Sequence, residues 1–340
     1  MTMGDSKDGG IPINLVLGSG GARGLTHIGV VRVLQEQGYR IKSITGCSMG
    51  ALVGALLVSG HLDDYEKWVT QLTRWDVFRF LDISLLGRSG MVKGDKLMER
   101  LGEWLAGVQM ESLEIPLTVV AADIVSRKEV WISRGDLLEA VRASIAVPGV
   151  FTPLVKHGRV LVDGGILNPL PIPPARMENS TITVAVSLSG QEVHQPFGDL
   201  SVNVPAEIEE EPKIEEQKEE QSREDRHAPI EGFLDSLQRY FGRDRVEEND
   251  DPAQSGGGEP PGDFTPITEQ PALTDVMLGM FNTMQDTIAR HQLAGNPPDI
   301  LIDIPCNICQ SHEFHRAAEL IPAGAFWARR ALEDQRNSFR

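Results

Sequence analysis

The sequence has no uninterrupted apolar run near the ~20 residues that a membrane-spanning helix needs. Three cysteines do not make the disulfide framework of a small secreted domain. Lys and Arg number 32 against 49 Asp and Glu, without a basic cluster, which argues against nucleic acid as the main partner. The first ten residues are polar and lack the apolar core of a secretion signal. These absences predict a cytoplasmic protein and leave open peripheral contact with the inner face of a membrane.

Acidity is concentrated in one part of the 340-residue chain. The segment from Ala206 to Asp263 carries 19 acidic and 7 basic residues, so the rest of the chain is close to neutral. Residues 191–271 are rich in Glu, Pro, Gly and Gln, and they hold too few apolar side chains to offset the entropy of ordering. We therefore expect a disordered acidic insert there.

One stretch of this insert, residues 229–243, differs from its surroundings. Five apolar residues in it share a helical face: Phe233, Leu234, Leu237, Tyr240 and Phe241. The pattern fits a transient helix, and it also fits a docking segment for a protein partner or a lipid surface. Both interpretations are kept.

The remaining sequence predicts one α/β domain in two parts, residues 11–190 and 272–335, after a disordered start at residues 1–10. Strands at 13–17 and 41–44 alternate with helices at 25–37 and 51–58, and this β-α-β-α order predicts a parallel sheet. Hydrophobic residues make up 41% of the chain, enough for a substantial core. We also expect further strands at 117–122, 128–132, 160–163, 181–188 and 300–304, and helices at 62–77, 93–105, 137–144, 273–293 and from about 313. Apolar positions of the helix at 273–293 are Val276, Met280, Met284 and Ile288.

A strand-to-helix junction contains the pentapeptide Gly46-Cys47-Ser48-Met49-Gly50. A serine at such a turn, with small residues two places to either side, is the arrangement called a nucleophile elbow. The serine hydroxyl then lies beside the free N–H groups at the start of the following helix. A glycine-bearing turn without chemistry has the same pattern, so the rest of the chain must supply the other parts of a site.

A glycine-rich loop, Gly18 to Gly24, follows the first predicted strand. The dinucleotide spacing Gly-x-Gly-x-x-Gly fails, because Arg23 stands at its third glycine position, and no acid follows at the expected distance. We therefore expect no nucleotide cofactor. The N–H groups of Gly20 and Gly21 can instead bind an oxyanion, at about 3–4 kcal/mol per well-placed donor. Arg23 either adds positive charge there or braces the loop.

A serine nucleophile needs a base, and none of the eight histidines follows a predicted strand in the manner of a triad histidine. Asp163 does end a predicted strand, directly before Gly164 and Gly165. Such a turn can simply cap a strand. With an elbow and a glycine loop in the same chain, however, the sequence favours the carboxylate as the direct base.

Three blocks, Gly18 to Gly24, Gly46 to Gly50 and Asp163 to Gly165, resemble the signature blocks of bacterial patatin-like phospholipases, in the branch related to neuropathy target esterase. Supporting stretches are His27-Ile28-Gly29-Val30, Arg142-Ala143-Ser144 leading to Pro148-Gly149, and Asn168-Pro169-Leu170-Pro171. The likeness covers residues 13–190 and, more weakly, 273–331. Ser19 stands where many members have the first of three glycines.

The resemblance implies a three-layer α/β/α fold and a Ser48–Asp163 dyad that hydrolyses esters of phospholipids, lysophospholipids or related lipids without a metal. Gly20 and Gly21 would then hold the oxyanion. Two alternatives are kept. One is an α/β-hydrolase esterase whose triad adds a late histidine, such as His291 or His312. The other is a regulatory or scaffolding protein that uses the same core and acts through the acidic insert.

One cluster of metal-binding residue types remains, Cys306-x-x-Cys309-x-x-His312-x-x-His315. Structural zinc sites usually separate their two ligand pairs by a dozen or more residues. Here all four side chains fall within ten residues, across a predicted strand-to-helix junction, where one tetrahedral centre is hard to reach. We expect no metal.

Overall fold

The computed structural model describes residues 10–80, 95–148, 150–175, 181–194, 197 and 273–338. All of these belong to one compact unit, which comprises residues 1–203 and 271–340. The predicted acidic insert lies outside the described residues, apart from residues 191–194 and 197, and so does its segment 229–243. Their order and their partners therefore stay predictions, as does the disorder of the N-terminus.

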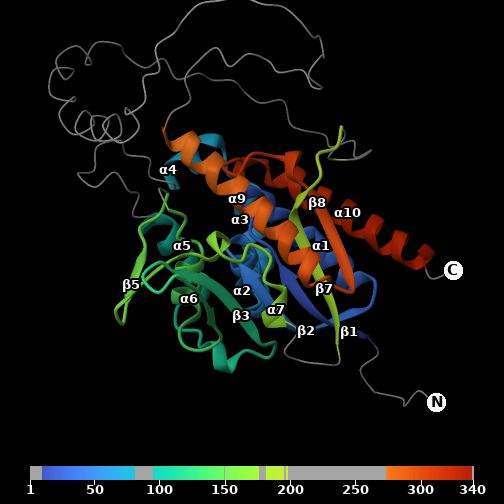
Figure 1. Ribbon diagram of the computed structural model, residues 1–340, viewed down its shortest axis with the longest axis horizontal. Helices are drawn as coiled ribbons and strands as arrows, with labels where there is room; N and C mark the ends of the chain where they lie inside the picture. The colour runs from blue at the N-terminus through green and yellow to red at the C-terminus, as the bar shows by residue number, and fades with distance from the viewer. Residues whose placement is uncertain are drawn as a thin grey trace, which may run out of the picture. The chain divides into compact units, whose positions relative to one another are not determined.

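The described residues form one eight-stranded sheet (Figure 1). Its strands are β1 Ile11–Leu17, β2 Tyr39–Cys47, β3 Leu117–Asp123, β4 Lys128–Ile132, β5 Leu154–Lys156, β6 Arg159–Asp163, β7 Ile182–Gly190 and β8 Ile300–Pro305. The order is β5-β6-β3-β2-β1-β7-β8, with β4 paired to β3. Pairs among β3, β2, β1, β7 and β8 are parallel, whereas the pairs that β4, β5 and β6 make are antiparallel. The predicted parallel sheet is confirmed.

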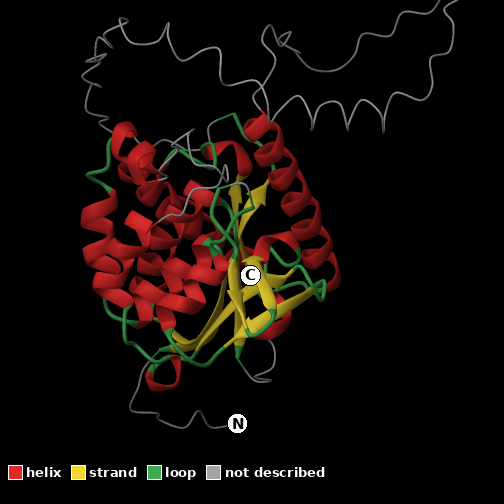
Figure 2. Ribbon diagram, turned by 90° about the vertical axis from the view of Figure 1, so that its left-hand side faces the viewer, coloured by secondary structure: helices red, strands yellow, loops and turns green. Residues whose placement is uncertain are grey.

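Helices cover both faces of this sheet (Figure 2). They are α1 Thr26–Glu36, α2 Met49–Val58, α3 Leu62–Val69, α4 Arg74–Phe80, α5 Asp95–Leu105, α6 Leu137–Ser144, α7 Ile172–Ala175, α9 Leu273–Gly295 and α10 Ala317–Ser338. Side chains alternate along β1, so that Leu15 and Leu17 join the larger core with α1, α2 and α10. Val16 faces the opposite side and packs in a smaller core with α7 and α9. The expected three-layer arrangement is therefore confirmed.

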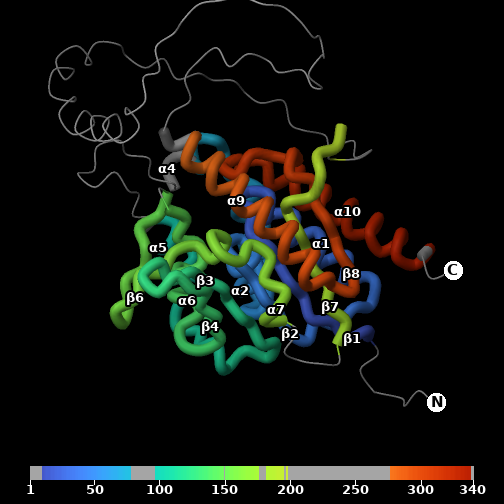
Figure 3. Tube along the Cα trace, viewed as in Figure 1, coloured from blue at the N-terminus to red at the C-terminus, as the bar shows by residue number. Residues whose placement is uncertain are grey.

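The first and last helices pack closely against each other, and Figure 3 shows the red α10 beside the blue α1. The contact depends on one glycine in each helix. A Cβ on Gly29 would lie 2.0 Å from the carbonyl oxygen of Ile321, and a Cβ on Gly324 would lie 2.0 Å from that of Thr26. The two backbones approach this closely because neither glycine carries a side chain.

The helix predicted at residues 62–77 is two helices, α3 and α4. The Thr73 hydroxyl accepts from the N–H of Asp76 at 3.2 Å, and the Asp76 carboxylate accepts from the N–H of Thr73 at 3.0 Å. This reciprocal pair is a capping box, and it starts a new helix at Arg74. The single-helix prediction was wrong because its periodic apolar residues run through this capping signal.

The apolar side chains predicted for α9 do not form its buried face. Val276, Met280 and Met284 are exposed, Met280 by 61%, whereas Gln285 and Ala289 are buried. The inward face of α9 joins the smaller core through Ala289 and also makes polar contacts. Asn282 accepts from the Ser311 hydroxyl at 3.1 Å, and Asp286 accepts from the Ser189 hydroxyl at 2.6 Å. These partners explain why the more polar side of the helix faces the protein.

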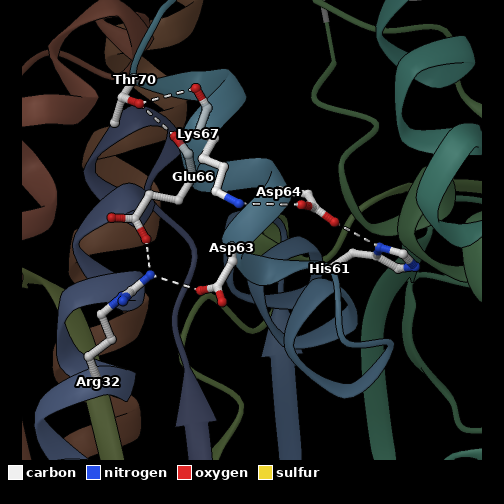
Figure 4. A network of polar contacts seen from close by, with 7 residues as sticks. All are labelled: Arg32, His61, Asp63, Asp64, Glu66, Lys67 and Thr70. Carbon is white, nitrogen blue, oxygen red and sulfur yellow. Dashed lines mark hydrogen bonds and ion pairs between the residues drawn. The ribbon is translucent and has the colours of Figure 1, made fainter.

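Exposed ion pairs join α1 to α3, as Figure 4 shows. The guanidinium of Arg32 lies 2.9 Å from the carboxylate of Asp63 and also pairs with Glu66. Exposed ion pairs of this kind contribute about 0–1 kcal/mol to stability. The buried ring of Tyr65 therefore holds α3 more firmly than these pairs do. In the described part of the chain, no helix has the length and apolar character required to cross a bilayer.

Candidate active site

The turn at Ser48 joins β2 to α2 and has the geometry of a nucleophile elbow. Ser48 adopts φ 54° and ψ −121°, a backbone conformation that residues other than glycine rarely adopt. Both flanking glycines are sterically required: a Cβ on Gly50 would lie 2.1 Å from the carbonyl oxygen of Leu17, and one on Gly46 would lie 2.5 Å from that of Gly50. The strained serine is 5% exposed and stands directly before the first turn of α2.

Ser144, the last residue of α6, holds the backbone of this elbow. Its hydroxyl oxygen accepts from the N–H of Ser48 at 2.8 Å and donates to the carbonyl oxygen of Val120 at 2.6 Å. The Ser144 side chain is completely buried. Since the Ser48 N–H is already bonded, oxyanion donors must come from other residues.

The glycine loop after β1 supplies such donors. The N–H of Ser19 donates to the Pro169 carbonyl at 2.8 Å, and the N–H of Ala22 donates to the Ser311 carbonyl at 2.9 Å. Between these two anchored residues, the N–H groups of Gly20 and Gly21 make no hydrogen bond to any described residue. Gly21 has φ 57°, and a Cβ there would lie 2.5 Å from the Ser311 carbonyl oxygen. The loop is therefore fixed at both ends and presents two consecutive donors.

Arg23 braces this loop from below. Its Nε donates to the carbonyl oxygen of Gly20 at 3.2 Å, and one of its terminal nitrogens donates to that of Leu188 at 3.1 Å. The side chain is buried. Of the two roles considered for Arg23, the geometry favours bracing. Its guanidinium bonds the carbonyl of Gly20, which belongs to the same peptide group as the free N–H of Gly21.

Strand β3 explains why Asp163 lies beside the elbow. On one edge of β3, Cys47 of β2 pairs with Val120, and Asp163 of β6 pairs with the next residue, Ala121. Strand β4 occupies the other edge along both positions. Thus β6 continues the edge at the point where β2 turns away at Ser48. This register brings Ser48 and Asp163 together, although they are 115 positions apart in the chain.

The Asp163 carboxyl is completely buried, and burial raises its pKa from 3.8 to about 7. Two interactions oppose the rise by favouring the ionised form. They come from the Ser48 hydroxyl and from the N–H of Gly165, which donates to Oδ1 at 2.7 Å. The thiol of Cys47 lies 4.0 Å from the same oxygen. A carboxyl with a pKa near neutrality is suited to general base catalysis.

The second oxygen of this carboxyl, Oδ2, makes no complete hydrogen bond to a described residue. Ser48 is close enough to lower the pKa of Asp163, yet the two side chains are not joined by a bond of full hydrogen-bonding geometry. Catalytic hydrogen bonds are often long before substrate binds. The Asp163 carboxyl thus lies close to the strained serine, and one of its two oxygens is free of hydrogen bonds to described residues.

None of the described partners of Asp163 is a histidine. The two histidines named for a triad, His291 and His312, are both exposed. His27 lies under the glycine loop, where its Nε2 is 2.9 Å from the carbonyl oxygen of Gly18. Burial lowers the pKa of His27 to about 4, so its imidazole is neutral and donates from Nε2. Among the described residues, no histidine is thus a partner of the Asp163 carboxyl.

The Cys306 to His315 cluster does not form a ligand shell. Among the residues that the structure describes, no three His, Cys, Asp or Glu side chains are gathered closely enough to hold a metal ion. Burial raises the pKa of the Cys309 thiol to about 12 and also raises that of Cys306.

The sequence interpretation missed one polar contact with the site, made by Gln285 of α9. Its side-chain nitrogen donates to the Ser19 hydroxyl at 3.0 Å. The same nitrogen would lie 2.0 Å from a Cβ on Gly165. The only signal in the sequence was a glutamine between apolar positions of a predicted helix, which is too common to indicate a site.

Comparison with known proteins gives consistent results over most of the chain. The family model described as "Patatin-like phospholipase" matches residues 15–176. An uncharacterized NTE family protein of Mycobacterium tuberculosis is 39% identical over 331 residues, covering 94% of this chain and 91% of the relative. A second one, from Mycobacterium bovis, matches equally.

Two further matches have lower identity and cover a smaller share of the matched protein. Neuropathy target esterase sws of Drosophila melanogaster is 32% identical over 190 residues, which is 54% of this chain and 13% of that protein. Among solved structures, VipD from Legionella pneumophila matches with a TM-score of 0.42 and 15% identity, covering 96% of this chain and 67% of that one.

Proposed function

This chain belongs to the NTE family of patatin-like phospholipases, and from that premise we propose that it hydrolyses carboxylic esters of phospholipids or lysophospholipids through an acyl-enzyme on Ser48. The family makes it a lipid acyl hydrolase. The dyad mechanism and the substrate class are our proposal. Its main support is one observation: the buried Asp163 carboxyl has an unpartnered oxygen beside a strained serine.

In the proposed reaction, ionised Asp163 accepts the Ser48 proton while Oγ attacks the ester carbonyl carbon. The negative charge that develops on the carbonyl oxygen is held by the N–H groups of Gly20 and Gly21, which have no described partner. The N–H of Met49 at the start of α2 is also unbonded among the described residues and adds a third donor. Protonated Asp163 then gives its proton to the leaving alcohol.

The second half of the reaction reverses these roles. Water enters next to the acyl-enzyme, Asp163 takes one of its protons, and hydroxide character develops on the water oxygen as it attacks the acyl carbon. Breakdown of the tetrahedral intermediate returns the proton to Ser48 and releases the fatty acid. No step requires a metal or an organic cofactor.

A panel of lipid esters tests this proposal. The panel comprises phosphatidylcholine, lysophosphatidylcholine and a short-chain ester, incubated with wild type and with Ser48→Ala. We expect fatty acid release from at least one lipid by wild type and none by the variant, with unchanged circular dichroism. Turnover by folded Ser48→Ala would refute the nucleophile. Alanine variants of His27, His291 and His312 distinguish a dyad from a triad. A triad that uses His291 or His312 loses activity when that exposed histidine is replaced, whereas a dyad loses activity with neither.

We also propose that the exposed apolar side of α9 contacts the surface of a lipid bilayer. This side comprises Val276, Met277, Met280 and Met284, which are all exposed. Gln285 and Asp286 of α9 contact Ser19 of the glycine loop and Ser189 near the end of β7, so this part of the helix lies at the edge of the sheet where β1 and β2 end. The apolar side therefore lies at the same edge as the catalytic groups, where a lipid substrate must arrive.

A further inference from the structure

We propose that Gln285 is a positioning residue for this reaction, and that it holds the glycine loop in register with the turn that carries Asp163. This inference rests on the proposed Ser48–Asp163 function. It concerns a helix that follows the long undescribed part of the chain, outside the three sequence blocks that carry the catalytic groups.

Two residues from distant parts of the chain, Ser19 and Gly165, meet at the Gln285 amide. The amide nitrogen donates to the Ser19 hydroxyl at 3.0 Å, and the amide oxygen is 3.3 Å from the same hydroxyl. A Cβ added to Gly165 would lie 2.0 Å from the amide nitrogen and 2.9 Å from the Ser19 oxygen. Glycine at position 165 therefore makes room for the amide, and the two loops of the site meet across it.

Each contacted residue is one step from a reacting group. Ser19 directly precedes the free donor Gly20, and its own N–H is anchored to Pro169. Gly165 donates its N–H to Oδ1 of Asp163. A movement of the Gln285 amide would consequently displace the oxyanion donors on one side and the base on the other.

The burial of this amide supports a specific role. Gln285 is 2% exposed, and a buried amide is stabilising only when it is hydrogen-bonded. More apolar side chains of the same helix, such as Met284, face outward. The buried Gln285 amide and the Ser19 hydroxyl are thus hydrogen-bonded to each other, although the neighbouring Met284 is apolar and faces outward.

The contact should influence the transition state more than substrate binding. The oxyanion develops only during the reaction, so misplaced donors lower kcat and leave KM nearly unchanged. A merely structural role would lower the amount of folded enzyme and leave the kcat of that folded fraction intact.

A double-mutant cycle between Ser19 and Gln285 tests the proposal. Gln285→Met keeps the length of the side chain and removes its hydrogen bond, and Ser19→Ala removes the other partner. Using the lipid ester that wild type cleaves, we expect each single variant to lose about tenfold in kcat with KM within about twofold. The double variant should lose the same tenfold, because either change already breaks the contact. Active enzyme is counted by titration with a fluorophosphonate that labels Ser48.

Ser189→Ala is the matched control, since it breaks a contact between α9 and β7 at Asp286, the residue next to Gln285. We expect it to retain kcat within about twofold. Comparable losses in the control, wild-type kcat in Gln285→Met, or multiplicative losses in the double variant would each overturn the inference. If Gln285→Met does not fold, wild-type kcat in Ser19→Ala overturns it alone. Activity in Ser48→Ala would refute the proposed function instead, so the two failures are distinguishable.

Discussion

The hydroxyl oxygen of Ser144 lies 2.8 Å from the backbone nitrogen of Ser48 and accepts a hydrogen bond from its N–H. The same hydroxyl donates to Val120, so one buried side chain connects the nucleophile to the strand that also pairs with Asp163. Two buried backbone groups depend on this single oxygen.

Replacing Ser144 by alanine should therefore be costly. The variant removes the acceptor of the Ser48 N–H and a donor to the Val120 carbonyl, and each buried group left unsatisfied costs about 1–3 kcal/mol. We expect the free energy of unfolding in urea to fall by about 2–4 kcal/mol, together with a loss of kcat. Ser59→Ala, at the other end of α2, removes only a hydroxyl bonded to a nearby carbonyl and should cost under about 1 kcal/mol. Equal effects of both variants would contradict the role of Ser144.

The strain at Ser48 predicts a gain in stability when the serine is replaced by glycine. A φ of 54° with ψ −121° suits glycine, and such strain costs on the order of 1–3 kcal/mol. Part of the relief is offset because glycine gains freedom in the unfolded chain. We expect Ser48→Gly to be inactive and to melt at a higher temperature than Ser48→Ala, which keeps the strain. A lower melting temperature of the glycine variant would contradict a strained elbow.

The raised pKa of Asp163 predicts the pH dependence of catalysis. Only the ionised carboxylate accepts the Ser48 proton, so kcat/KM should fall tenfold per pH unit below about 7. His27 cannot cause this limb, because its pKa is about 4. The measurement is kcat/KM between pH 5 and 9 with an uncharged ester, with folding checked by circular dichroism. An acidic limb near pH 4 would show that burial does not raise the pKa of the base.

The same carboxyl predicts how stability depends on pH. Its pKa is about 7 in the folded protein and near 3.8 when unfolded, so folding binds protons between these values and stability falls as pH rises through that window. Asp163→Asn removes the buried charge and should exceed wild type in stability by up to about 4 kcal/mol above pH 7. The difference should shrink as pH falls toward 4, and denaturant titrations at pH 4, 6 and 8 measure it. A difference that does not vary with pH would exclude the linkage.

Contact of α9 with lipid predicts that charge on its exposed side weakens vesicle binding. Met280→Lys should reduce co-sedimentation with phosphatidylcholine vesicles, since burying an ammonium group at an apolar surface is unfavourable. Zwitterionic vesicles are the suitable probe, because the chain carries a net charge of −17 and anionic lipids would repel it. Ile11→Lys is the matched control, since Ile11 is exposed at the opposite end of β1. Equal binding by both variants would place the lipid contact elsewhere.

The parts of the site that could be predicted from the sequence are those encoded locally. The elbow, the glycine loop and the Asp163 turn each combine a strand end with glycines, and each lies where such a turn was predicted. Ser144 could not be predicted as the support of Ser48, because their contact depends on how α6 packs against β3. The position of Gln285 was equally hidden, since the apolar residues of α9 favoured the opposite face.

The helix predicted at residues 273–293 is present as α9, but most of its apolar positions do not mark its buried face, and the reason is physical. Helical periodicity shows which residues share a face, and burial follows only if the partner surface is apolar. Here the partner surface offers the hydroxyls of Ser19, Ser189 and Ser311, which bind amide and carboxylate side chains of the helix. The hydrogen bonds of the partner surface therefore decided the orientation.

The pairing of α1 with α10 has a consequence for synthesis on the ribosome. Helix α1 must wait for a partner that lies about 290 residues later in the chain, which corresponds to roughly 15–60 s of translation at 5–20 residues per second. The Ser311 carbonyl that anchors the glycine loop arrives in the same late stretch. The nucleophile is thus translated early, whereas the Ser311 carbonyl that anchors the glycine loop follows about 260 residues later.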